Sequence, residues 1–177
     1  MIVTITGTPG VGKSTVADIL NDKGYVVKSV GELAEKYETI TGEEMGSRII
    51  DTEALSSRID RSRFTILEGH LSHQLDPDMV IVLRCNPKIM KERLAKKGWE
   101  EAKILENLEA EITDSILMEA MSHKTVYEVD TSERSPEEVA EVVIKLIEEG
   151  GEDFKPGKID WILEIGDDLG GLIRKHF

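Results

Sequence analysis

The stretch Gly7-Thr8-Pro9-Gly10-Val11-Gly12-Lys13-Ser14-Thr15 decides how this chain folds, because it joins the apolar run 2–6 to a segment with helical spacing. Glycines allow a tight turn in which several backbone N–H groups face one anion, and the N-terminus of the following helix adds its dipole there. The lysine then reaches the outer phosphates of a nucleotide, and the serine hydroxyl is placed to bind Mg²⁺. The alternative is a glycine turn with an incidental lysine. We predict a phosphate-binding loop whose ATP ligands are Pro9, Gly10, Val11, Gly12, Lys13, Ser14 and Thr15.

The composition points to one globular domain. The 177 residues are 40% hydrophobic and 32% charged, which suits one buried core and leaves little for a second domain. A net charge of −13 argues against a general nucleic-acid groove. The single cysteine, Cys85, cannot form an internal disulfide, and no apolar run is long enough to span a membrane. We expect a cytoplasmic protein without membrane association or sequence-specific contact with nucleic acid.

Strand-like and helix-like segments alternate along the chain. The predicted strands are 2–6, 25–30, 64–68, 79–83 and 125–130, and the predicted helices are 15–21, 32–37, 51–59, 86–97, 100–122 and 135–149. The polar stretch 38–47 is predicted to be a mobile loop or a lid. This alternation predicts an α/β fold, a doubly wound sheet of five parallel strands with helices on both faces.

The last part of the chain, residues 151–177, is predicted to be a C-terminal extension. A Lys-Pro-Gly-Lys turn at 155–158 breaks any continuing helix, and residues 159–165 are amphipathic at best. Trp161 either packs back on the domain or binds a partner, and the first interpretation suits a lone aromatic better.

A second polar group follows the third predicted strand, where Glu68, Gly69 and His70 stand in sequence. Ligands of open α/β sheets collect at the carboxyl ends of the strands, so these side chains should face the phosphate-binding loop. A carboxylate there holds the water shell of Mg²⁺, and we predict that Glu68 and Ser14 organise the metal. An imidazole exchanges a proton near neutrality, so His70 is predicted to relay a proton or to position the attacking group or water, although a surface histidine is the alternative.

Basic residues crowd into one short segment of this acidic chain. Seven of the 22 Lys and Arg residues lie there, namely Arg84, Lys88, Lys91, Arg93, Lys96, Lys97 and Lys103. Arg93 and Lys97 are four residues apart and share one helical face. Cations that close over a phosphate chain stabilise its developing charge and exclude water. We predict a lid in which Arg93 is catalytic and Lys97 is a further ATP ligand; the alternative is a solvated charged face.

Four motifs in a fixed order carry a family resemblance: Gly-Thr-Pro-Gly at 7–10, Gly31-Glu32-Leu33, Glu-x-His at 68–70, and Arg-Leu-Ala-Lys-Lys-Gly-Trp at 93–99. Over roughly residues 1–148 the chain resembles archaeal members of the adenylate kinase isoenzyme 6 family, also called the coilin-interacting nuclear ATPase family. The resemblance implies a P-loop NTPase of the nucleoside monophosphate kinase fold, with a kinase domain at 1–150, an acceptor-binding region at 29–50 and a short lid at 96–106.

The same resemblance implies an activity and a partner. It implies reversible phosphoryl transfer from ATP to AMP and a slower ATPase activity. From the residues themselves we predict Lys13, Glu68, His70 and Arg93 as the catalytic residues of this transfer, with Mg²⁺ bound alongside ATP. The resemblance also implies a role in maturation of the small ribosomal subunit through a platform ribosomal protein.

The chain departs from the family pattern at two positions. Where adenylate kinases usually place an arginine that grips the monophosphate, this chain has Glu35, and the second arginine of the lid is Lys97. Lys36 or Arg48 would have to bind the monophosphate in place of the usual arginine, and a lysine cannot form the same bidentate hydrogen bonds to a phosphate. Asp51 either helps to bind the acceptor or caps the helix that follows it, and the cap suits the residue better. The predicted acceptor-binding residues are Gly31, Glu32, Lys36, Arg48 and Asp51.

The sequence leaves two other functions open. One is an ATPase assembly factor for a small-subunit ribosomal protein, in which kinase activity is incidental; an acidic protein suits a basic partner. The other is a P-loop kinase for a different small acceptor.

Overall fold

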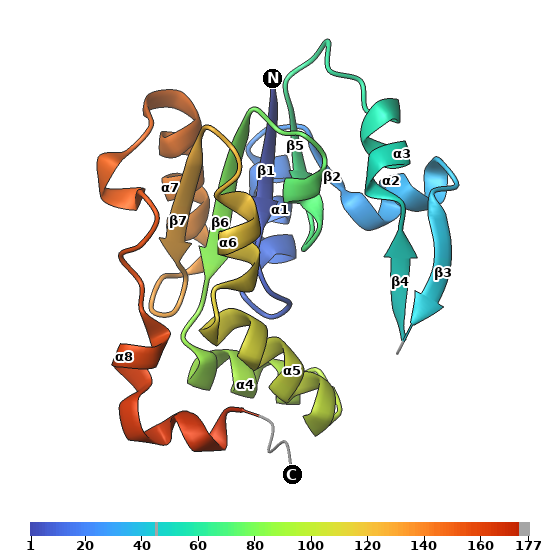
Figure 1. Ribbon diagram of the computed structural model, residues 1–177. Coiled ribbons are helices and arrows are strands. Elements are labelled where there is room, and N and C mark those ends of the chain that lie inside the picture. The colour runs from blue at the N-terminus through green and yellow to red at the C-terminus, as the bar shows by residue number, and fades with distance from the viewer. Residues whose placement is uncertain (45, 174–177) are drawn as a thin grey trace.

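The computed structural model describes residues 1–44 and 46–173. Within these residues, five parallel strands form one sheet in the order β2-β5-β1-β6-β7 (Figure 1). The strands are β1 (Ile2–Thr6), β2 (Val27–Ser29), β5 (Thr65–Glu68), β6 (Met79–Arg84) and β7 (Val126–Asp130). β1 lies in the centre, so the loop that follows it emerges in the middle of the carboxyl edge. The predicted doubly wound sheet is confirmed, although β2 is shorter than 25–30, because it begins only at Val27 and Val30 already begins a helix.

Helices cover both faces of this sheet. They are α1 (Lys13–Asp22), α2 (Val30–Lys36), α3 (Thr52–Arg58), α4 (Pro87–Lys96), α5 (Glu101–Ile112), α6 (Ser115–Ala120), α7 (Pro136–Glu149) and α8 (Trp161–Ile165), with 3₁₀ turns at Ser72–Gln74, Glu152–Phe154 and Gly166–Gly171. Local chemistry sets several starts: the Asn86 side chain accepts the Lys88 N–H, and Ser135 forms a capping box with Glu138. Among the described residues, no helix is both long and apolar enough to cross a membrane.

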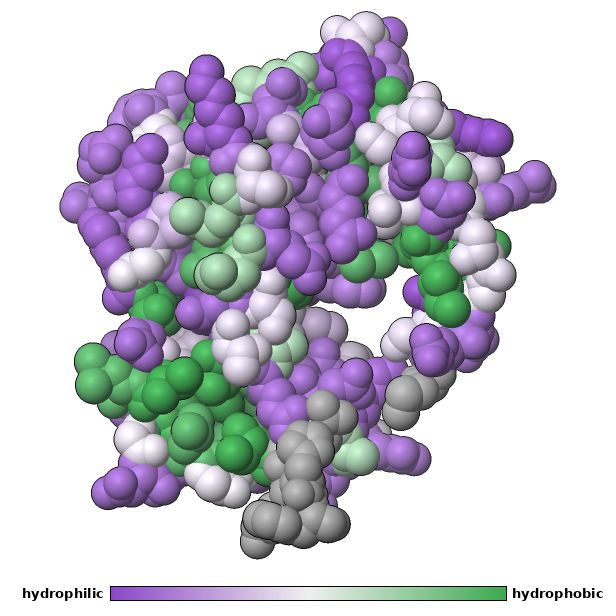
Figure 2. All heavy atoms as spheres, viewed as in Figure 1, coloured by the Kyte–Doolittle hydropathy of each residue, from purple (hydrophilic) through white to green (hydrophobic). Residues whose placement is uncertain are grey.

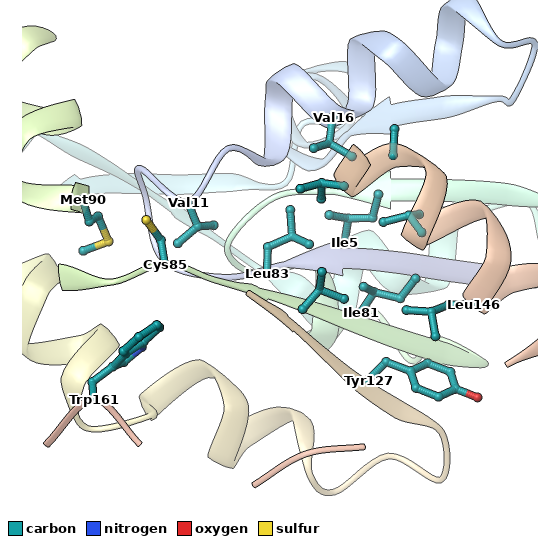
Figure 3. Packing of buried hydrophobic residues seen from close by; sticks show 14 of the residues in the cluster. Ile5, Val11, Val16, Ile81, Leu83, Cys85, Met90, Tyr127, Leu146 and Trp161 are labelled. Atoms are coloured by element: carbon teal, nitrogen blue, oxygen red, sulfur yellow. The ribbon is translucent and has the colours of Figure 1, made fainter. Parts of the chain in front are cut away.

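Alternating side chains divide the core between the two faces. Val3 and Ile5 of β1 and Ile81 and Leu83 of β6 join one large cluster with α1 and α7. Val80 and Val82 instead pack with α6 on the opposite face, as a strand's period of two requires. Figure 3 shows the large cluster, in which Leu146 and Tyr127 lie at one end and Met90, Cys85 and Trp161 at the other.

The stretch 38–47, predicted to be a mobile loop or a lid, is part of a hairpin, so the prediction of a loop was wrong, and the lid stays a prediction. β3 (Ile40–Glu44) pairs antiparallel with β4 (Ser47–Ile50) in a separate two-stranded sheet. Ile40 and Ile50 pair at its base and pack on a small cluster that contains Leu33 of α2 and Leu55 of α3. Two apolar residues at the base are therefore enough to order a stretch whose tip is polar and exposed.

The single helix predicted at 100–122 was also wrong, because the chain breaks between α5 and α6. Asp114 adopts a left-handed conformation with φ of 57°. Its carboxylate pairs with Arg84, which is buried at the end of β6. Arg84 therefore does not belong to a cationic lid: the other partners of its guanidinium are the buried carboxylates of Glu111 and Glu128.

The C-terminal extension is described as far as residue 173 and packs into the main core up to Leu172; the rest of 151–177 lies outside the described residues. Trp161, Ile165 and Leu172 belong to the same cluster as the central strands. Trp161 is 1% exposed, so the interpretation of this residue as a core aromatic is confirmed. Glu128 receives the backbone N–H groups of Gly157 and Lys158, which fixes the turn before α8.

Replacing Arg84 with methionine is expected to lower the free energy of unfolding by about 3–5 kcal/mol, because it leaves two buried carboxylates without their cation. Urea titration measures this change. Lys88→Met is the matched control: Lys88 also pairs with a carboxylate, Asp168, but both side chains are exposed, so stability should hardly change. Equal losses in the two variants would contradict the prediction.

Candidate active site

One cleft of about 880 Å³ runs along the carboxyl edge of the sheet. Its floor is the loop 7–12 and the start of α1, one wall is the β3–β4 hairpin, and the other is formed by α4, α5 and the turn between them. The space-filling view shows an opening between the hairpin and the lobe that carries α4 and α5 (Figure 2). The predicted site residues in its lining are Pro9, Gly10, Gly12, Lys13, Ser14, Thr15, Gly31, Arg48, Glu68, His70 and Lys97.

The loop after β1 has the conformation that its glycines permit. Gly7 has φ of 135°, and a Cβ at this position would lie 2.3 Å from the Leu83 carbonyl oxygen. Gly12 has φ of 101° and forms the N-cap of α1. Both conformations favour glycine, and together they turn the chain from the central strand directly into the helix. The N-terminus of α1 therefore faces the cleft, where its dipole favours an anion.

Lys13 points along this loop and is nearly buried. Its Nζ donates to the carbonyl oxygens of Gly7 at 2.7 Å and Thr8 at 3.0 Å. Burial lowers the pKa of Lys13 to about 8, although the carboxylates of Glu68 and Glu111 act in the opposite direction. The ammonium group is thus desolvated and held at the floor of the cleft, where an oxyanion would strengthen its charged form.

Glu68 and His70 lie beside the loop because β5 is the neighbour of β1. Glu68 pairs in register with Ile5, one residue before the end of the central strand. The Thr6 hydroxyl donates to the His70 carbonyl at 3.2 Å and fixes the backbone there. Partial desolvation lowers the pKa of His70, although the residue is exposed at the cleft, and the Lys13 charge lowers it further. His70 is therefore a neutral imidazole near pH 7, able to hold or accept a proton at the cleft.

The hairpin wall carries Arg48, one of the two residues predicted to bind the monophosphate in place of the usual arginine. Arg48 of β4 forms an ion pair with Glu35 of α2, and both side chains are about half exposed. Arg48 lines the cleft. Glu35, which stands where adenylate kinases usually have an arginine, therefore binds Arg48. Arg48 is the one arginine in the described lining of the cleft.

The opposite wall is basic and touches the hairpin. Lys97 and Lys103 line it, and the Lys103 ammonium lies 5.0 Å from the centre of the Trp99 ring. Lys103 Nζ also donates to Ser47 Oγ at 3.3 Å, which connects the segment after α4 with β4. In contrast, Lys88 and Lys91 contact Asp168 and the Gly171 carbonyl of the C-terminal extension. The basic segment therefore divides into structural and cleft-facing cations.

Other predicted residues lie outside the described lining of the cleft. Arg93 donates to the Thr131 carbonyl at 3.4 Å, and Lys36 lies over the Tyr37 ring. Asp51 accepts the Ala54 N–H and caps α3. The two remaining residues are Val11, whose side chain is buried in the core, and Glu32.

Glu111 lies behind the loop, is 2% exposed and was not predicted as a site residue. It accepts a hydrogen bond from the Thr8 hydroxyl at 2.6 Å and another from Arg84 at 2.7 Å. One signal was available. Glu111 stands seven residues after Ile104 and three after Leu108, so it is a charged residue on the apolar face of its helix.

The donor set at the floor suits Mg²⁺. The Ser14 hydroxyl and the Glu68 carboxylate both line the cleft, and hard oxygen ligands of this kind are the ones that Mg²⁺ prefers. In the described part of the chain, no three His, Cys, Asp or Glu side chains are grouped to hold a metal on their own. This fits an ion that is shared with phosphate oxygens, because Mg²⁺ usually uses one or two protein ligands there.

The fold has counterparts among solved structures. Shikimate kinase from Acinetobacter baumannii superimposes with a TM-score of 0.57 at 17% identity, over 82% of this chain and 92% of that one. Thymidylate kinase from Candida albicans gives 0.52 at 16% identity, over 83% and 90%. Together with the sheet order and the loop, these likenesses identify the nucleoside monophosphate kinase fold of P-loop proteins.

Sequence comparison gives closer relatives. The AAA domain family model matches residues 3–114. A protein of Archaeoglobus fulgidus named "Putative adenylate kinase" is 51% identical over 99% of both chains. A protein of Methanocaldococcus jannaschii with the same name is 45% identical over 91% of this chain and 93% of its own. The chain therefore belongs to the family of archaeal proteins that bear this name.

Proposed function

We propose that this chain is an adenylate kinase-type phosphotransferase that moves the terminal phosphate of Mg-ATP to AMP and forms two molecules of ADP. The observation that carries the proposal is the cleft at the carboxyl edge of the sheet, which has a phosphate-binding loop at its floor and an arginine on its hairpin wall, with Glu68 and His70 beside the loop. The names of the archaeal relatives support the same chemistry. The cleft has a volume of about 880 Å³, which is near the upper end of the range for ligand pockets. A large cleft is expected here, because ATP and AMP must bind in it together.

The floor of the cleft is the proposed ATP site. Backbone N–H groups of the loop and the N-terminus of α1 receive the phosphates, and Lys13 exchanges its two carbonyl partners for phosphate oxygens. Ser14 and Glu68 would hold Mg²⁺, which when bound neutralises phosphate charge. Lys97 approaches from the lid, proposed at 96–106. Arg93 takes part only after its side chain leaves the Thr131 carbonyl.

The hairpin wall is the proposed acceptor site, within 29–50. A phosphate oxygen of AMP attacks the terminal phosphorus of ATP, the bond from that phosphorus to the bridging oxygen breaks, and the ADP produced leaves with the bridging electrons. Arg48 would bind the AMP phosphate once it separates from Glu35. Neutral His70 would orient the attacking group. The protein contributes position and charge, since this reaction asks little covalent chemistry of it.

We further propose that the chain is of the isoenzyme 6 type, with a slower ATPase activity in which water replaces AMP and phosphate is released. The ordered motifs quoted above support this subtype. A partner in small-subunit maturation, a basic platform ribosomal protein, is in keeping with the net charge of −13. The Arg48–Glu35 pair favours a share of ATPase activity, because it competes with acceptor binding.

AMP is expected to raise ADP formation from Mg-ATP far above the release of free phosphate, because transfer to AMP makes two ADP and no phosphate. A coupled ADP assay and a phosphate assay on the same sample measure ADP formation and phosphate release.

His70→Ala should reduce the rates of phosphoryl transfer to AMP and of ATP hydrolysis by about 10²-fold or more, as loss of a positioned proton-transfer group does. If AMP has no effect and phosphate equals ADP, the protein is an ATPase; if His70→Ala keeps both rates, the role of His70 is wrong.

Affinity for Mg-ATP is expected to fall as pH rises from 7.5 to 9.5. The pKa of Lys13 in the free protein is about 8, so binding above that pH must first return a proton to the ammonium group. The loss approaches about tenfold per pH unit once Lys13 is neutral in the free protein. Calorimetric titration at several pH values measures it. Lys13→Arg should bind more weakly but without this pH dependence, since arginine stays charged.

Arg48→Ala is expected to raise KM for AMP about tenfold or more, because a charge-assisted hydrogen bond to the phosphate is lost. Glu35→Gln should lower that KM by up to about fivefold, since an exposed ion pair no longer competes for Arg48. Both variants should keep the wild-type rate of ATP hydrolysis without AMP. A larger effect of Lys36→Ala on KM for AMP would assign the grip to Lys36 instead.

A further inference from the structure

Glu111 is a buried carboxylate with both oxygens occupied. Oε1 accepts from Arg84 Nε at 2.7 Å, from Trp161 Nε1 at 2.9 Å and from the Cys85 N–H at 3.2 Å. Oε2 accepts from the Thr8 hydroxyl at 2.6 Å. A carboxylate with this many donors has one well-defined orientation, because rotating it would leave several buried donors unpaired.

Trp161 reaches this carboxylate from far along the chain. The residue begins α8, and its indole is 1% exposed, packed at the end of the core cluster that contains Cys85 and Met90 (Figure 3). The Arg84 guanidinium lies 5.9 Å from the centre of its ring. A tryptophan N–H that is buried needs an acceptor, and here the acceptor is the carboxylate that also holds the phosphate-binding loop.

Thr8 connects this cluster with the cleft. Its hydroxyl binds Glu111, and its carbonyl oxygen accepts from Lys13 Nζ at 3.0 Å and from the Val11 N–H at 3.3 Å. Displacement of Thr8 would therefore move both the turn of the loop and the cation at its floor. Three consecutive hydrogen bonds lead from the indole of α8 to the Lys13 ammonium.

We propose that Trp161 is a positioning residue for the phosphate-binding loop, acting through Glu111 and Thr8, and that the C-terminal extension is thereby a working part of the nucleotide site. Trp161 touches no substrate. Its N–H fixes one oxygen of Glu111, and the rigid carboxylate then fixes the Thr8 side chain with the other. The proposal rests on the proposed function only in taking this loop as the ATP site.

Trp161→Phe tests the proposal because it keeps an aromatic ring in the core and removes the N–H. Leu146→Val is the matched control, since Leu146 is also fully buried but lies at the opposite end of the cluster (Figure 3). Hydrogen exchange in the protein without nucleotide should be faster over residues 7–13 in Trp161→Phe and unchanged there in Leu146→Val. Equal exchange of that segment in both variants, at similar losses in Tm, would assign Trp161 a merely structural role.

Calorimetric binding of Mg-ATP gives the second measurement. Trp161→Phe should weaken binding of Mg-ATP about three- to tenfold. This is less than the full effect of losing a hydrogen bond to a charged group, because Trp161 acts on the loop only through Glu111 and Thr8. In a Thr8→Val background the same substitution should have little further effect, because the connection is already broken. Full additivity of the two substitutions would overturn the proposal. Neither measurement uses AMP, so a failure of the kinase assignment leaves both results interpretable.

Discussion

The buried ion pair of Arg84 and Glu111 is the constraint on which the rest of the structure depends. An arginine that is 1% exposed and a glutamate that is 2% exposed are tolerated only because each guanidinium nitrogen and each carboxylate oxygen has a hydrogen-bond partner. Burial alone would lower the pKa of Arg84, but the carboxylates of Glu111 and Asp114 raise it. The pair joins the end of β6, the break between α5 and α6, the extension after α7 and the phosphate-binding loop.

The cations of this acidic chain serve different purposes according to their burial. Arg84 is buried and holds the core together. Lys88 is exposed and Lys91 is half-buried, and both hold the C-terminal extension against α4. Lys13, Lys97, Lys103 and Arg48 face the cleft, and the first of these is desolvated enough to have a lowered pKa. A charge that is both desolvated and open to a ligand is the kind that binds phosphate strongly, since water no longer screens it.

The two ends of the cleft differ in how they are built. The phosphate-binding floor belongs to the central strand and its helix, and it is supported from behind by Glu111. The hairpin wall packs on a separate small cluster and meets the other wall through Lys103 and Ser47. A rigid floor and a wall with few buried contacts suit a site that must hold one ligand in place and admit another.

Much of the fold and the floor of the site could be predicted from the sequence, because local patterns determine them. Continuous apolar runs predicted the strands, and glycines at fixed spacing predicted a loop whose φ values only glycine favours. The hairpin at 40–50 was missed because its apolar residues are few and far apart, and their value depends on α2 and α3. The break at Asp114 was missed because its cause is Arg84, thirty positions earlier in the chain.

The sequence by itself determined the strands and the phosphate-binding loop, since each follows from neighbours along the chain. That Glu68 and His70 face this loop was predicted from the rule that ligands collect at the carboxyl ends of parallel strands, and it depends on the pairing of β5 with β1. Only the tertiary structure decided which basic residues face the cleft, that Glu35 holds Arg48, and that Trp161 and Thr8 share one carboxylate. These contacts join residues far apart in sequence. Local sequence patterns do not reveal such contacts, because they form only when the folded elements pack against one another.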